Sequence, residues 1–150
     1  MMMKTKLSTG IILMIVLATG PARGAGTGEQ ARADSNIQAI SWDAWLAAKT
    51  KAEQYDAAGD FVSALQYYLE YTRQAEGLSD PARSAWGKNN AAYMIIKMHR
   101  QDPSVDLTPA GKLLQEGLAI REAADDCRKV LAMNLEYVKL SLGRTPERAL

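Results

Sequence analysis

The chain of 150 residues is 47% hydrophobic and 23% charged, and its formal net charge is +1 at pH 7. This near-neutral balance argues against binding to nucleic acid or to anionic membranes, because both need clustered Lys and Arg. Cys127 is the only cysteine, which excludes an intramolecular disulfide. The fold must therefore be held together by its hydrophobic core alone.

Residues 1–24 have the layout of a secretory signal peptide. Two lysines precede a short apolar run at 11–18, and small residues follow it. The run is shorter than the roughly 20 apolar residues of a membrane-spanning helix, and the small residues fit cleavage before Arg23 or Ala25. We expect an exported protein, periplasmic or secreted, with a mature net charge of about −2 and no integral membrane span once the signal is removed. An uncleaved N-terminal anchor is the alternative.

Residues 25–40 and residues 41–150 are patterned differently. The first stretch is rich in Gly, Ala and polar residues without apolar periodicity, which predicts a flexible leader. From residue 41 onward, apolar residues recur at three- and four-residue steps, and no stretch alternates as a strand does. The sequence therefore predicts one all-α domain over 41–150 with about five helices.

The first two helices are delimited by capping residues. Ser41 and Asp60 can each accept a hydrogen bond from a free backbone N–H at a helix start, whereas Gly59 and Gly77 suit helix ends. The side chains expected to face inward are Trp42, Trp45, Leu46, Ala48, Ala52 and Tyr55 in the first helix and Phe61, Ala64, Leu65, Tyr68, Leu69 and Ala75 in the second.

Proline marks the starts of the third and fourth helices. Asp80-Pro81 and Thr108-Pro109 combine a capping side chain with a residue that has no N–H to satisfy. The third helix should stop by Asp102-Pro103, because the residue before Pro disfavours the helical conformation. Asp125 is expected to cap a fifth helix; the alternative is one unbroken helix in place of the fourth and fifth. The inward residues expected in these helices include Trp86, Asn89, Tyr93, Ile96, Leu114, Gly117, Met133, Tyr137 and Val138.

Small and aromatic residues recur at fixed places in the first helix pair. This series comprises Ala52, Tyr55, Gly59, Phe61, Ala64 and Tyr68, and Trp86 and Tyr93 follow seven residues apart. The chain thereby resembles the tetratricopeptide repeat family, whose units are antiparallel helix pairs of about 34 residues. The resemblance covers about 41–150 and departs at Asn89-Asn90, where the family has Leu-Gly. It implies an all-α, short right-handed array of stacked helical hairpins. An Ala-rich helical hairpin with Tyr at helical spacing is the alternative.

The resemblance further implies a concave groove lined by the first helix of each pair. The positions carried over are Lys49, Glu53, Asp56, Lys88, Ala91, Met94, Ile95, Arg128, Leu131, Leu135 and Val138. The implied function is a scaffold or adaptor that binds a protein or peptide in this groove. Alternatively, Met94, Ile95 and Leu135 pack against a tail or a second copy, which would make the protein a self-associating structural component of the cell envelope, such as a homodimer.

Residues suited to catalysis are sparse. His99 is the only histidine, and it lies near a predicted helix end, where a cation interacts favourably with the helix dipole. One His and one Cys do not make a zinc site. We therefore expect no enzymatic activity, no catalytic residues, no metal and no cofactor, with Cys127 partly buried rather than a reactive thiol. A small helical enzyme or carrier of an apolar ligand is a third class, which would need a closed cavity.

Overall fold

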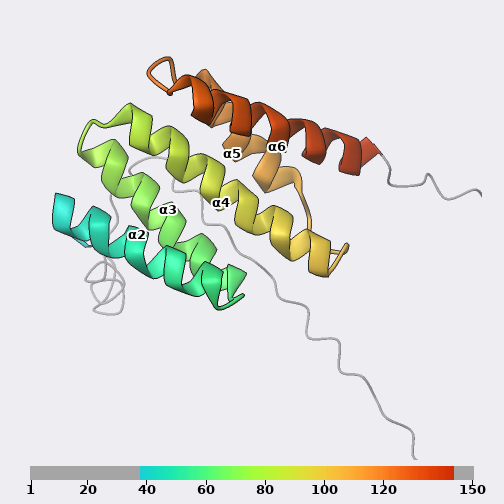
Figure 1. Ribbon diagram of the computed structural model, residues 1–150, viewed down its shortest axis with the longest axis horizontal. Helices are drawn as coiled ribbons and strands as arrows, with labels where there is room; N and C mark the ends of the chain where they lie inside the picture. Colours follow the sequence, from blue (N-terminus) through green and yellow to red (C-terminus); the bar gives the residue numbers. More distant parts are fainter. Residues whose placement is uncertain (1–37, 144–150) are drawn as a thin grey trace, which may run out of the picture. The chain divides into compact units, whose positions relative to one another are not determined.

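A computed structural model describes residues 38–143, which form five helices and no strand. The helices are α2 (Trp42–Ala57), α3 (Phe61–Gly77), α4 (Pro81–Gln101), α5 (Thr108–Ala119) and α6 (Asp125–Gly143). Consecutive helices run in opposite directions and pack against each other, and α4 also contacts α6 (Figure 1). The predicted all-α array is confirmed, with two helices after residue 107. The predicted signal peptide, most of the leader and the last seven residues lie outside the described part.

Local capping explains where the first three of these helices begin. The Ser41 Oγ accepts a hydrogen bond from the Ala44 N–H at 3.0 Å, and Asp60 and Asp80 accept from the N–H groups three residues later. Gly59 takes a φ of +79° in the turn between α2 and α3, a conformation that glycine adopts without steric cost. These capping predictions are confirmed because they depend only on residues adjacent in sequence.

Two predicted helix boundaries differ in detail. After α3, the residue with positive φ is Ser79, at 55°, and not Gly77. Gly77 instead leaves room for Ile40, whose side chain would lie 2.6 Å from a Cβ at that position. At α5, Leu107 occupies the N-cap position without a side-chain bond, and the Thr108 N–H donates to the Asp106 carboxylate at 2.8 Å. Thr108 is therefore inside the helix and is not its cap.

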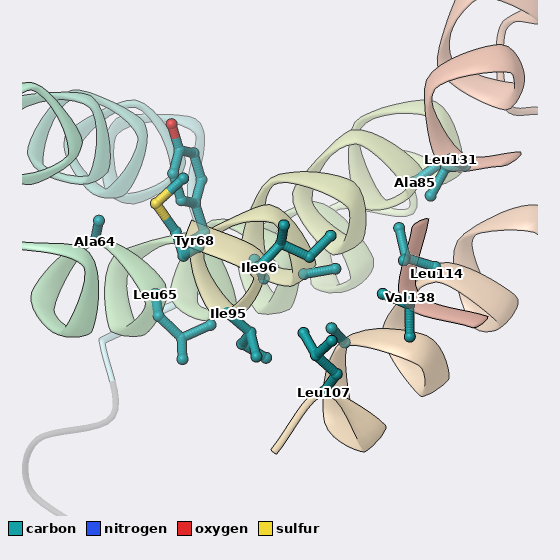
Figure 2. Packing of buried hydrophobic residues seen from close by; sticks show 14 of the residues in the cluster. Ala64, Leu65, Tyr68, Ala85, Ile95, Ile96, Leu107, Leu114, Leu131 and Val138 are labelled. Carbon is teal, nitrogen blue, oxygen red and sulfur yellow. The ribbon is translucent and has the colours of Figure 1, made fainter. Parts of the chain in front are cut away.

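The core joins α3, α4, α5 and α6, and α2 contributes Ala52 to it. Figure 2 shows Leu65 of α3 near Ile95 of α4, and Leu114 of α5 near Val138 of α6. The α3–α4 pair approaches closely at Gly87, where a Cβ would lie 2.3 Å from the Thr72 Oγ1. Small residues thus set the spacing of the helices, and branched side chains fill the space between them.

Several large side chains that we expected inside are on the surface. Trp42, Leu46 and Tyr55 are 49%, 53% and 37% exposed. The α2 residues that face α3 are alanines four residues apart, which allow a close approach and move larger neighbours to the edges. On the other helices, Leu69 and Met133 are also exposed. The predicted α2 stripe is therefore correct only for its alanines, and for Trp45 in part. The buried residues of α2 are Ala44, Ala48 and Ala52.

Candidate functional site

One face of α4 presents a continuous row of polar and aromatic side chains. Their spacing of three and four residues places them on one side of the helix, along about 25 Å of its length. All are exposed or half-buried. We call this row the α4 stripe; it consists of Arg83, Trp86, Asn90, Tyr93, Lys97 and Arg100.

At its N-terminal end, the α4 stripe meets two tryptophans of α2. The Arg83 guanidinium lies 5.0 Å from the ring centres of both Trp42 and Trp45. The two indoles contact each other edge to face, with their centres 5.9 Å apart. Arg83 also forms an ion pair with Asp80. These contacts hold the guanidinium in place and leave about half of Trp42 open to solvent.

Further along, Lys97 connects α4 to both α2 and α3. Its Nζ lies 2.5 Å from a carboxylate oxygen of Asp56. The same ammonium group lies 5.2 Å from the ring centre of Phe61 and 4.9 Å from that of Tyr93. The charge is therefore neutralised by a carboxylate and flanked by two aromatic faces.

Arg100 ends the α4 stripe and connects it to α6. Its guanidinium carbon lies 4.8 Å from the ring centre of Tyr137 and 5.9 Å from that of Tyr93. Within residues 38–143, Arg100 has no carboxylate within ion-pair distance. An arginine fork held between two tyrosines can therefore accept an anionic group from outside these residues.

Five of the eleven predicted groove residues lie in the core. Met94 is 1% exposed, and the others in this group are equally inaccessible. They pack among the side chains that join the helices, so they form no floor of an open groove in this structure. The five are Ala91, Met94, Ile95, Leu131 and Val138.

Two of the predicted groove cations are bound internally. Lys88 pairs with Glu76 and Glu116 at 3.1 Å each, joining α4 to α3 and α5. Burial acts to lower the pKa of Lys88, but these two carboxylates outweigh it and the pKa is raised. Arg128 donates to backbone carbonyls of the α5–α6 connection, the shortest at 2.6 Å to Ile120. Neither side chain is free for a partner in this arrangement.

The remaining predicted positions are nearer the surface. Lys49 and Glu53 form an ion pair of 2.6 Å along α2, and Asp56 is the partner of Lys97. Leu135 is half-buried against the core. The α2 members of the predicted groove are therefore accessible. Most of its α4 members are not, and the accessible side of α4 is the α4 stripe.

The sequence contains a signal for the α4 stripe that the predicted groove did not use. Arg83, Lys97 and Arg100 alternate with aromatic residues at three- and four-residue spacing. Trp86 and Tyr93 were expected to point inward, whereas both are only partly buried. The cations should have indicated which face of α4 meets solvent, because charged residues are rarely fully buried.

The two candidate reactive side chains, His99 and Cys127, are both engaged within the fold. The His99 Nδ1 is hydrogen-bonded to the Val105 carbonyl at 2.8 Å, which ties the α4–α5 connection to α4. Cys127 is buried, and this burial raises the pKa of its thiol. In the part of the chain that the structure describes, no group of His, Cys, Asp and Glu could hold a metal ion. A hollow of about 410 Å³ over Leu46 and Lys51 on α2 is open to solvent.

Comparisons of the chain with protein-family models, with curated proteins and with solved structures found no match. Among the helices between residues 38 and 143, none is both long and apolar enough to cross a membrane. Function is therefore inferred from the α4 stripe and the side chains of α2 and α6 beside it.

Proposed function

We propose that this protein is a non-enzymatic binding module that holds a segment of another protein on the α4 stripe. The observation that carries the proposal is the row of partly exposed Trp, Tyr and Arg side chains, fixed by contacts with α2 and α6. These three residue types are enriched at the energetic centres of protein interfaces. Side chains that are already ordered lose less conformational entropy when a partner binds.

The dimensions of the α4 stripe suit a short segment. About 25 Å corresponds to seven or eight residues of extended chain or to roughly 17 residues of helix. The exposed Trp42 ring at one end offers an apolar contact, and Arg100 at the other end offers a charge that pairs with no carboxylate of residues 38–143. A bound segment would therefore have an apolar side chain near one end and a carboxylate near the other.

Two features of the sequence complete the proposal. The layout of residues 1–24 supports export to the periplasm or beyond, where the partner would be found. The resemblance to tetratricopeptide repeats supports a scaffold or adaptor role. N-terminal sequencing of the protein from an envelope fraction tests export, with a mature start at Arg23 or Ala25 as the expected result; an unprocessed Met1 would contradict cleavage.

The binding proposal is tested with variants at both ends of the α4 stripe. Immobilised mature protein is exposed to its own envelope extract, and retained proteins are compared for wild type, Trp42→Ala and Arg100→Glu. A matched control, Lys112→Glu, reverses an exposed charge on α5. We expect the control to retain the same proteins as wild type and the two variants to lose them about tenfold or more. Equal retention by all four proteins, each with an unchanged circular dichroism spectrum, would refute the role of the α4 stripe.

A second candidate is a self-associating structural protein of the envelope. It is favoured by one observation, the 69% exposure of Met133 on α6. An exposed apolar side chain indicates a protein contact when its neighbours on the surface form a continuous patch with it.

A further inference from the structure

The last helix of the described array has two very different sides. Cys127, Leu131 and Val138 of α6 face inward and are buried. On the opposite side, four exposed residues follow one another at spacings of four, three and four, the spacing of a helix-packing seam. We call them the α6 outer face: Lys129, Met133, Glu136 and Leu140.

The apolar members of the α6 outer face are unusually open. Met133 is 69% exposed and Leu140 is 51% exposed, one heptad apart. Neither side chain packs against another described helix as the inward residues do. Burying Met133 would remove apolar surface from water, which favours association with a second apolar surface.

The order of charges on this face identifies its occupant. Lys129 precedes Met133, and Glu136 follows it, so the face reads positive, apolar, negative, apolar along the helix. Two parallel copies of α6 would place Lys129 beside Lys129 and Glu136 beside Glu136. Two antiparallel copies would instead place Lys129 of each copy near Glu136 of the other, with the Met133 side chains between them.

We infer that the α6 outer face is a self-association surface on which a second copy of the chain packs antiparallel about a two-fold axis. Each Lys129–Glu136 contact occurs twice in such a pair, because the same surface is used by both copies. The contact area of a single helix pair is small, so the dimer is a weak one. We expect a dissociation constant on the order of 100 µM.

Sedimentation of the full mature chain, from low micromolar to submillimolar concentration, measures this association. Lys129→Glu and Glu136→Lys each convert two attractive contacts into two repulsive ones. Each should weaken the dimer about tenfold or more. The double variant exchanges the charges and restores both contacts, so its dissociation constant should return to within about threefold of wild type. The control Lys112→Glu should leave it unchanged.

Two outcomes would overturn the inference. The chain could remain a monomer throughout this range, or it could dimerise with no response to either single reversal. Rescue by the charge exchange supports the antiparallel pair in particular, because residues 129 and 136 are two helical turns apart and do not interact within one copy.

The inference deepens the second candidate function, self-association, and rests on it, but it is independent of partner binding at the α4 stripe. Arg100→Glu alters the α4 stripe and should leave the dissociation constant of the dimer unchanged. Conversely, loss of the dimer in Glu136→Lys would not remove partner binding at the α4 stripe.

Discussion

The two sides of α4 do different physical work although their residues alternate along one helix. On the inner side, Gly87, Ala91 and Met94 are buried, and their contribution depends on fitting a fixed volume. On the outer side, Arg83, Lys97 and Arg100 interact with aromatic rings at about 5 to 6 Å. The residues that hold the array together are therefore separate from those that a partner can reach, and substitutions on the two sides should have different consequences.

The largest expected effect is on the inner side, at Met94. Met94→Ala removes a fully buried side chain and should lower the free energy of unfolding by about 2–5 kcal/mol, measured by urea denaturation. The volume-conserving Met94→Leu is the control, with a loss below about 1.5 kcal/mol. If Met94→Ala were as stable as wild type, Met94 would line an open groove after all, and the distinction between the two sides of α4 would fail.

Gly87 should be the next most sensitive position. Replacing a helical glycine by alanine usually stabilises by up to about 1 kcal/mol, but here the new Cβ would lie 2.3 Å from the Thr72 Oγ1 and 2.6 Å from the Tyr71 ring. The steric cost should dominate, and Gly87→Ala should destabilise by about 1–3 kcal/mol.

Gly111 provides the matched control for Gly87. A Cβ there would have its nearest neighbour, Val138 Cγ1, at 3.4 Å, close to an ordinary contact. Gly111→Ala should therefore be neutral or stabilising by up to about 1 kcal/mol. Thermal melts measure both variants. If Gly87→Ala and Gly111→Ala changed the melting temperature in the same direction, the close α3–α4 approach would be contradicted.

On the outer side, the ion pair of Lys97 and Asp56 should contribute much less to the free energy of unfolding. Both side chains are about one quarter exposed, and they lie 2.5 Å apart, so their attraction is partly screened by solvent. A double-mutant cycle with Lys97→Ala and Asp56→Ala should give a coupling of about 0.5–1 kcal/mol. A coupling as large as the loss at Met94 would show that the outer side also holds the array together.

The difference between local contacts and helix packing explains which features could be predicted from the sequence alone. Ser41, Gly59 and Asp80 were assigned correctly because a cap or turn depends on neighbours a few residues away. The accessible face of α4 was not assigned correctly. The predicted groove used Ala91 and Met94, whereas the structure leaves the residues one position earlier partly exposed. One step along a helix turns a side chain by about 100°. Which face is covered depends on α5 and α6, which follow later in the chain.

The buried face of α2 was harder to predict for a related reason. The predicted buried stripe included Trp42, Leu46 and Tyr55, which are large apolar side chains. The buried side consists instead of Ala48 and its neighbouring alanines. Small residues bury little surface each, so they give a weak periodic signal. They nevertheless decide which side of a helix can approach another closely.

The smallest expected effect concerns Asp80, which begins α4 and pairs with Arg83. Hydrogen bonds from the Arg83 backbone and side chain hold the pKa of Asp80 below its ordinary value of 3.8. Because the pKa is lower in the folded state, ionised Asp80 stabilises the fold above about pH 4 and loses this contribution as the pH falls through the folded pKa. The carboxylate is near the surface, so the contribution should be less than about 1 kcal/mol.

Asp80→Asn isolates the charge, because Asn is also a good N-cap. The variant should be slightly less stable than wild type at neutral pH, and the difference should shrink as the pH falls below about 4 and wild-type Asp80 becomes protonated. Urea denaturation at several pH values measures both curves. A difference that is independent of pH would mean that Asp80 acts only as a neutral cap. The Arg83 guanidinium would then be held at the start of the α4 stripe mainly by Trp42 and Trp45.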